Sequence, residues 1–155
     1  MGIYFNYNQS LLTSGSHVVA SDPMRSAHGY YTPHFSVGAS SNPSTGAYIT
    51  FGQNYNNSRG LFNGSTFTAP TTGLYFFYFH GSLNPSIQNK YVSIRKNSST
   101  SWEQRIYSSS QPDRSFMGGY KLFHMSEGDT CRVYNVNAGL LGANNYTTFS
   151  GGLIQ

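Results

Sequence analysis

Residues 60–80 read GLFNGSTFTAPTTGLYFFYFH and hold seven aromatic side chains around a Thr-Phe-Thr-Ala-Pro turn. Successive side chains of a β-strand point to opposite faces of its sheet. In a strand over residues 74–80 (LYFFYFH), the odd-numbered positions therefore form one face and the even-numbered positions the other. Both faces are aromatic, and His80 ends the second. This stretch predicts a strand with two apolar sides.

The second aromatic face needs a partner. A strand of a two-sheet sandwich packs one face into the core and turns the other face outward. An exposed aromatic patch of this size usually marks an interface. Packing of several copies around a symmetry axis would cover it. The alternative is a central strand covered by loops of the same chain, and the sequence leaves that alternative open.

The composition favours an all-β domain. The chain has 155 residues, enough for one domain, with 17 Gly, 13 Tyr and 11 Phe, which suit strands and tight turns. Charged residues make up only 9% of the chain, against about 25% in a typical protein, so the surface must be polar and mostly uncharged. The 16% of aromatic residues supply enough apolar surface to disfavour disorder.

Short alternations of apolar and polar residues recur from residue 34 onward, with turn residues between them. Strands are predicted over residues 34–37, 47–51, 66–68, 73–83, 90–96, 102–108, 116–124, 130–137 and 147–154. Many short strands at this spacing are typical of a sandwich or barrel. The preceding segment has one short alternation and then loop-like sequence. We therefore divide the chain into an N-terminal segment 1–34, an extra strand or ordered tail, and a domain over 35–155.

Two classes of partner are disfavoured. The formal net charge is +4, but the nine basic residues are scattered along the chain apart from Arg95 and Lys96. A nucleic-acid footprint needs basic residues clustered on one face. No apolar run approaches the ~20 residues of a membrane span, so neither nucleic acid nor membrane insertion is expected. Cys131 is the single cysteine, and we expect a small buried side chain there, on one strand face with Val133 and Asn135.

Six segments carry a family resemblance: FSV at 35–37, ITF at 49–51 followed by Asn57 and by FN at 62–63, TFTAP at 66–70, GLYFF at 73–77, GD at 128–129 and FSGGLI at 149–154. In this order they resemble the globular C1q-type domain of the complement C1q and tumour-necrosis-factor-like superfamily. The chain departs from the family pattern at two points. The spacing from Phe62 to Phe67 is short, which predicts a clipped turn, and Cys131 stands where the family has an aliphatic residue.

The resemblance implies a ten-stranded jelly-roll sandwich that assembles as a homotrimer, with both termini at one end and binding loops at the other. It also implies a secreted or extracellular protein that is not an enzyme and needs no cofactor. Members of the family bind diverse partners, including receptors, bacterial surfaces and glycans. The expected residues of the core or the trimer interface are Phe51, Phe67, Tyr75, Phe76, Phe77, Tyr78, His80 and Phe149.

No constellation of catalytic or metal-binding residues stands out. The five acids are Asp22, Glu103, Asp113, Glu127 and Asp129, and paired carboxylates for glycoside hydrolysis are possible only in principle. The histidines lack zinc spacing. Calcium needs six to eight oxygen ligands, so no metal site is predicted, although three Asp113 side chains could share a weak calcium site. Copies of His80 at a threefold axis could bind an ion or respond to pH.

A lectin-like function has positive support from the residue types. Asn, Gln and Arg side chains can hydrogen-bond to sugar hydroxyls, and the faces of Trp and Tyr can stack on sugar rings. The candidate ligand-binding residues are Trp102, Arg105 and Tyr107 on one expected strand face, Asn145 and Tyr146 in the last loop, and Tyr55 and Arg59 in another loop.

The sequence therefore predicts a non-enzymatic, lectin-like pattern-recognition module of innate defence. It would bind glycans or microbial surfaces as a trimer, and avidity would strengthen weak single sites. A secreted ligand of a protein receptor, or a structural extracellular component, is the alternative.

Overall fold

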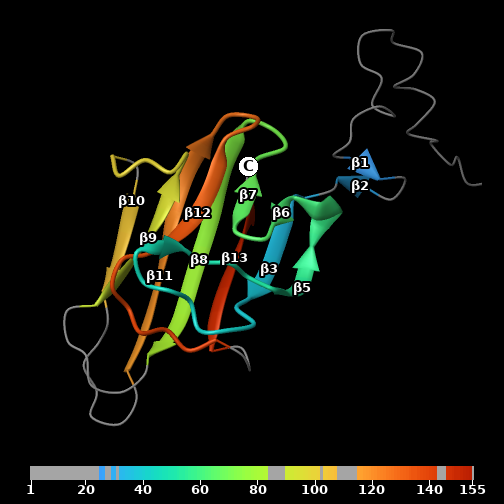
Figure 1. Ribbon diagram of the computed structural model, residues 1–155. Coiled ribbons are helices and arrows are strands. Elements are labelled where there is room, and N and C mark those ends of the chain that lie inside the picture. The colour runs from blue at the N-terminus through green and yellow to red at the C-terminus, as the bar shows by residue number, and fades with distance from the viewer. Residues whose placement is uncertain are drawn as a thin grey trace, which may run out of the picture. The chain divides into compact units, whose positions relative to one another are not determined.

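The computed structural model describes residues 25–26, 29–30, 32–83, 90–101, 103–107, 115–142 and 146–154 (Figure 1). The chain divides into two compact units, Met1–Thr32 and Pro33–Gln155. In the first unit, β1 (Arg25–Ser26) pairs antiparallel with β2 (Gly29–Tyr30). The second unit carries all the other described strands.

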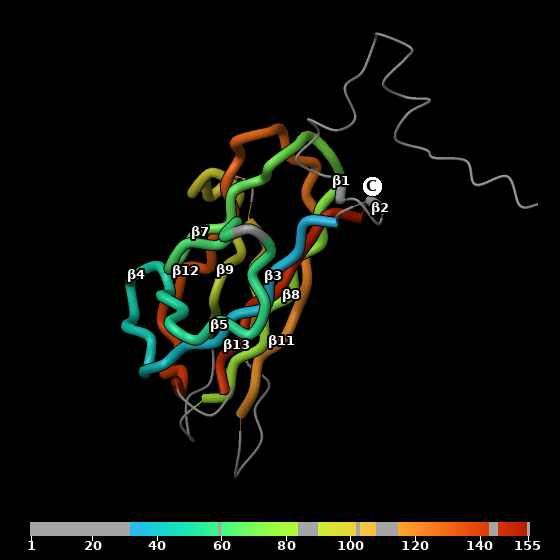
Figure 2. The backbone as a smooth tube through the Cα atoms, turned by 90° about the vertical axis from the view of Figure 1, so that its right-hand side faces the viewer, coloured from blue at the N-terminus to red at the C-terminus, as the bar shows by residue number. Residues whose placement is uncertain are grey.

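The second unit is a sandwich of two antiparallel sheets. One sheet, called the aromatic sheet, contains β3 (His34–Gly38), β5 (Gln53–Asn57), β8 (Gly73–Leu83), β11 (Ser115–Met125) and β13 (Thr147–Leu153). The other, called the arginine sheet, contains β4 (Ala47–Tyr48), β6 (Phe62–Asn63), β7 (Thr66–Thr68), β9 (Tyr91–Lys96), β10 (Glu103–Tyr107) and β12 (Thr130–Asn135). Figure 2 shows the two layers from the side.

The strand order is that of a jelly roll. It runs β11-β8-β13-β3-β5 in the aromatic sheet and β10-β9-β12-β7-β6 in the arginine sheet, where β4 also pairs with β12. The predicted all-β jelly-roll sandwich is confirmed. The described residues of this unit give eleven strands rather than the expected ten, because several strands are only two or three residues long and count separately.

The core lies between the sheets and is mainly aromatic. The odd-numbered residues of β8 from 75 to 79 are fully buried, as strand alternation predicts. The ring centroids of Phe77 and Phe149 are 5.9 Å apart, and those of Phe35 and Phe67 are 5.1 Å apart. Such ring pairs contribute about 0.5–1.5 kcal/mol beyond the burial of their area. The buried side chains include Phe51, Phe67, Tyr75, Phe77 and Phe149.

The sequence prediction missed strand β5 and the two-residue strands β1, β2 and β6. The β5 sequence QNYNN has no apolar alternation, because β5 is an edge strand of the aromatic sheet and all of its side chains are half-buried or exposed. Tyr55 was expected in a loop but lies on this strand, where its hydroxyl donates to Gln53 Oε1 at 2.6 Å. Arg59 follows in the short 3-10 turn η2 (Ser58–Gly60).

The clipped turn between Phe62 and Phe67 is a tight hairpin. Strands β6 and β7 place these two residues opposite each other, with only Gly64 and Ser65 as the loop. Gly64 has a φ of +58°, a conformation that glycine adopts without steric cost. The short spacing seen in the sequence is therefore what allows Phe62 and Phe67 to enter the core as a cross-strand pair.

The inward face of β12 consists of Cys131, Val133 and Asn135, all fully buried. Burial raises the pKa of the Cys131 thiol well above its usual value, and a backbone hydrogen bond involving Arg132 opposes this only in part. The thiol is thus neutral and inert at physiological pH. This agrees with the expectation of a small buried side chain at this position.

The two ends of the second unit meet. The backbone N–H of Leu153 donates to the carbonyl of Pro33 at 2.9 Å. Gly152 pairs with His34 in the register of β13 with β3. The first and last described residues of the sandwich therefore lie side by side at one end of the aromatic sheet.

Candidate functional site

The outward side of the aromatic sheet carries an exposed apolar patch. The register of β8 with β11 places Tyr120 opposite Tyr78 and Leu122 opposite Phe76. These four side chains have exposed fractions between 37% and 64%, and Phe116 on β11 is 53% exposed. The rings of Phe76 and Tyr120 stack with centroids 5.9 Å apart. We call these five side chains the aromatic face.

Small and polar residues extend the aromatic face toward β13. Ser150 lies opposite Tyr78, Gly152 lies opposite Phe76, and half-buried His80 lies opposite Thr148. The exposed fractions show that the described part of the chain does not cover the aromatic face. The alternative of a central strand covered by the chain's own loops finds no support there.

An open groove adjoins the aromatic face where edge strand β10 passes edge strand β11. Its volume is about 580 Å³, and it is lined by Gln104, Arg105, Ile106 and Tyr107 from β10 and by residues 118–122 from β11. Gly119 permits this approach, because a Cβ added there would lie 2.9 Å from the Ile106 side chain. Tyr120 and Leu122 belong to both the groove and the aromatic face.

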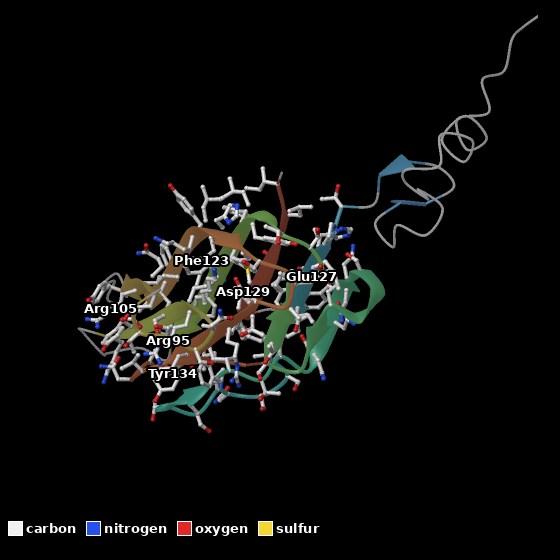
Figure 3. The ribbon with its side chains drawn as sticks, turned by 90° about the horizontal axis from the view of Figure 1, so that it is seen from above. Arg95, Arg105, Phe123, Glu127, Asp129 and Tyr134 are labelled. Carbon is white, nitrogen blue, oxygen red and sulfur yellow. The ribbon has the colours of Figure 1, made fainter. Side chains whose placement is uncertain are left out.

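The outward side of the arginine sheet has a different chemistry. Three guanidinium groups each lie over a tyrosine ring, with distances to the ring centre of 3.6 Å for Arg132 over Tyr48, 4.1 Å for Arg95 over Tyr134 and 5.4 Å for Arg105 over Tyr91. Ring pairs Tyr48–Tyr134 and Tyr91–Tyr107, with centroids 5.1 and 5.3 Å apart, extend the stack. Figure 3 shows Arg105, Arg95 and Tyr134 following one another along one side of the sandwich. We call these seven side chains the arginine–tyrosine ladder.

Glu103 connects two arginines of the ladder. Its Oε2 accepts from Arg95 Nε at 3.0 Å and its Oε1 accepts from Arg105 Nε at 2.6 Å. Burial by itself would raise the pKa of Glu103, but the hydrogen bonds from Arg105 and Arg95 outweigh this and lower the pKa. Glu103 therefore stays ionised and holds the two guanidinium groups on the sheet.

Two of the candidate ligand-binding residues come together on β10. Arg105 and Tyr107 share its outward side, and both line the groove. Because side chains alternate along a strand, Arg105 and Tyr107 share their side of β10 with Glu103. Position 102 has the opposite parity, so the prediction that Trp102, Arg105 and Tyr107 share one strand face is corrected. Trp102 itself, like Asn145, lies outside the described residues.

The remaining candidates lie on separate elements. Tyr55, 47% exposed, is on β5 at the far edge of the aromatic sheet, and Tyr146, 42% exposed, directly precedes β13. The structure therefore does not gather Tyr55, Arg105 and Tyr146 into one site. Sequence reasoning missed the ladder partners on β4, β9 and β12. The repeated pattern Arg-x-Tyr, at residues 105–107 and 132–134, was the available signal.

The side chain of Asp129 stabilises the turn between β11 and β12 through its own contacts. Its carboxylate accepts from Asn97 Nδ2 at 2.7 Å, pairs with Lys96 Nζ at 2.7 Å and accepts from the Ser126 backbone N–H at 2.8 Å. These contacts, with Asn97 the strongest, lower the pKa of Asp129 to about 2. Gly128 in the same turn has a φ of +84°. Asp129, labelled in Figure 3 beside Glu127, thus holds the turn rather than a ligand.

Within the part of the chain that the structure describes, His, Cys, Asp and Glu side chains form no group of three that could hold a metal ion. Asp113, the residue of the weak calcium hypothesis, lies outside that part. No described helix is long and apolar enough to cross a membrane.

The jelly-roll topology and the six motifs point to one family. The profile of the C1q domain matches residues 34–154. The chain belongs to the C1q domain family. Among solved structures, this C1q domain is similar to the globular domain of zebrafish complement 1qA protein, with 21% identity and a TM-score of 0.63 over 80% of this chain and 98% of that chain. It is also similar to murine APRIL at pH 8.0, with 15% identity and a TM-score of 0.62 over 79% of this chain and 99% of that chain.

At these identities the likeness to the solved structures is one of fold. Comparison with curated protein sequences gives no match. The predicted family is confirmed by the profile match, and family membership carries the coarse function. C1q domains are non-enzymatic recognition or ligand modules that form trimers and are generally extracellular.

Proposed function

We propose that this C1q domain assembles as a homotrimer and acts outside cells as a multivalent, lectin-like recognition module of innate defence, which binds glycans on cell or microbial surfaces. The aromatic face is the observation that carries the proposal, because it provides a surface through which several copies can associate. A secreted ligand of a protein receptor, or a structural extracellular component, is the second candidate, and family membership is equally compatible with it.

The aromatic face supports self-association. Burial of apolar surface stabilises an interface by about 25 cal/mol per Å², and soluble monomers rarely expose large contiguous apolar patches. The rings of Phe76 and Tyr120 stack across β8 and β11, and Tyr78 lies opposite Tyr120 in the strand register. A second copy of this chain is the occupant we propose, since domains of this family form trimers.

The groove between β10 and β11 suggests how the copies meet. It is concave, adjoins the aromatic face, and shares Tyr120 and Leu122 with it. If the aromatic face of one copy packs against the β11 side of the groove in the next, each contact joins two different surfaces, and Arg105 and Tyr107 on the outward side of β10 stay accessible. Such a heterologous contact closes into a ring when the rotation between copies is suitable, and a rotation of one third of a turn gives a trimer.

Arg105 and Tyr107 support the choice of glycans as ligands. The Tyr107 ring is 59% exposed and the Arg105 side chain is 53% exposed, on the outward side of β10. A tyrosine ring offers an apolar surface for sugar C–H groups, and a guanidinium offers up to five N–H donors for sugar oxygens. Three weak sites in one assembly would raise the apparent affinity by about 10²–10⁴-fold.

The assembly is tested by light scattering. The wild-type protein should have three times the chain mass of 17.1 kDa. The double variant Tyr120→Asp with Leu122→Asp should be a folded monomer, because two carboxylates cannot be buried in an apolar interface without a large desolvation cost. Thr68→Asp, which adds a charge at an exposed position of β7, should stay trimeric. A wild-type mass near one chain would refute the homotrimer.

The ligand is tested with a glycan array probed by the assembled protein. Saturable glycan binding that is lost in Tyr107→Ala and kept in Thr68→Ala would support the lectin, provided that both variants keep the wild-type mass. Failure to bind any glycan, together with recovery of one specific protein partner, would favour the receptor ligand instead.

A further inference from the structure

The arginine sheet gathers cations that are scattered in the sequence. Arg105 lies on β10, Arg95 on β9 and Arg132 on β12, all on the outward side. The strand registers place Arg132 directly opposite Arg95, and Arg95 directly opposite Glu103. The even spread of basic residues along the chain therefore gave a wrong expectation for the folded surface, where three of them share one face.

This arrangement leaves positive charge uncompensated. Like charges directly opposite each other on neighbouring strands destabilise a sheet, and Arg95 and Arg132 are such a pair. Among the described residues, Glu103 is the carboxylate that contacts the ladder, so within this part of the chain the three guanidinium groups keep an excess of two positive charges. Their N–H donors also outnumber the acceptors that Glu103 and Ser65 supply.

We infer that the arginine–tyrosine ladder binds the carboxylate or sulfate groups of an acidic glycan, an inference that rests on the proposed function and names its ligand class. Guanidinium groups pair with planar or tetrahedral anions through two N–H donors at once. The neighbouring tyrosines hold these groups in place over their rings, and Tyr107 adds an exposed ring at the β10 end of the ladder.

The individual residues have different parts in this site. Arg105 has the exposed side chain and makes the first contact with the anion. Arg95, whose side chain is only 13% exposed, acts mainly through its charge and is held by Glu103 and Tyr134. Arg132 extends the positive surface toward β4 and the β6–β7 loop, where its Nη2 donates to Ser65 Oγ at 3.1 Å.

The position of the ladder is compatible with the homotrimer. The two outward sides of a sandwich face away from each other. The aromatic face lies on the outward side of one sheet, and the ladder lies on the outward side of the other. A trimer built through the aromatic face would therefore present three ladders to the solvent, as multivalent binding of a polymer requires.

The ladder suits an acidic glycan better than a nucleic acid. Binding of nucleic acid depends on many phosphate contacts along a basic track, whereas this face has three guanidinium groups with Glu103 among them. Single-stranded nucleic acids also need free aromatic faces on which bases stack. Here Tyr48, Tyr91 and Tyr134 already have a guanidinium over the ring.

The test uses the assembled protein and two matched pairs of labelled probes at about 150 mM salt. One pair is a galacturonate hexasaccharide and its methyl ester, which tests carboxylates. The other pair is dextran sulfate and dextran, which tests sulfates. We expect the acidic member of at least one pair to bind at least about tenfold more tightly than its neutral partner, since hydrogen bonds between ionised groups are roughly twice as strong as neutral ones.

Variants locate the site. Arg105→Gln and Arg132→Gln should each weaken binding of the acidic probe by about three- to tenfold. Arg59→Gln is the matched control, because it removes the same charge from η2, which follows β5 at the opposite edge of the aromatic sheet from β11. It should change the affinity by less than about twofold, since the solvent between the two sites screens its charge.

Equal affinity for the acidic and neutral members of both pairs would overturn the inference, and so would acidic binding that survives both arginine variants. Tighter binding of a 12-nucleotide single-stranded DNA than of either acidic probe would assign the ladder to nucleic acid and overturn it as well. Binding of neutral glycans alone would refute the acidic ligand and leave the proposed function standing. No binding to any glycan would refute both.

Discussion

The guanidinium carbon of Arg132 lies 3.6 Å from the centre of the Tyr48 ring, so that a residue of β12 rests on a residue of the short strand β4. The two strands pair through Tyr134 and Tyr48, whose rings meet edge to face. A cation over a partly buried ring contributes about 0.5–2 kcal/mol. This contact orients the guanidinium at one end of the ladder.

Replacement of Tyr48 tests this orientation. Tyr48→Leu should weaken binding of the acidic oligosaccharide by about two- to fivefold, because the guanidinium of Arg132 loses the ring that holds it. Tyr48→Phe keeps the ring and should bind like the wild type. Fluorescence anisotropy measures both affinities, and circular dichroism verifies the fold. Equal losses in the two variants would show that the ring does not position Arg132.

Asn135 is predicted to be essential for stability. It is fully buried, its Nδ2 donates to the carbonyls of Ser44 and Ala138, and its Oδ1 accepts from the Ala138 N–H at 2.9 Å. Asn135→Ala should lower the free energy of unfolding by about 2–4 kcal/mol, because several buried backbone groups lose their partners. Urea unfolding at fixed chain concentration measures this. Thr68→Ala, at an exposed site, should cost less than about 0.5 kcal/mol.

Gly151 is predicted to tolerate no side chain. A Cβ at this position would lie 2.6 Å from Phe77 Cδ1 and 2.7 Å from the backbone oxygen of Phe76. Gly151→Ala should lower the free energy of unfolding by about 1–3 kcal/mol or more, because β8 and β13 must separate to admit the methyl group. A thermal melt compared with that of Ser150→Ala measures the effect. If both variants melt at the wild-type temperature, the close packing of β13 on β8 is not as described.

The lowered pKa of Asp129 predicts that the free energy of unfolding decreases at acid pH. Its pKa falls from 3.8 to about 2 in the folded protein, so the ionised form is favoured by folding. The contribution, about 1–2 kcal/mol for a partly exposed group, is fully present above about pH 5 and is lost as the pH falls toward 2. The difference in unfolding free energy between the wild type and Asp129→Asn should shrink over this interval. A difference that stays constant from pH 5 to pH 2 would contradict the lowered pKa.

The sequence predicted the elements whose residues are buried in a regular pattern. The predicted bounds of β7 and β8 match the structure. A strand that buries alternate residues has an alternation of apolar and polar residues that can be recognised in the sequence. The polar strand β5 was missed, since an edge strand that buries little needs no apolar alternation. The Arg105–Tyr107 pair of the candidate site was recognised because both residues lie on one strand, two positions apart.

The sequence by itself determined the C1q family, the jelly-roll class and the two aromatic sides of β8, because each can be recognised from short motifs in their order along the chain or from alternation within one strand. The tertiary structure alone decided that Arg95, Arg105 and Arg132 share a face and that β10 forms a groove with β11. These neighbours come from different strands, and their contacts depend on the pairing register. A shift of register by one residue would send every side chain of a strand to the other side, so no single stretch of sequence could specify the ladder.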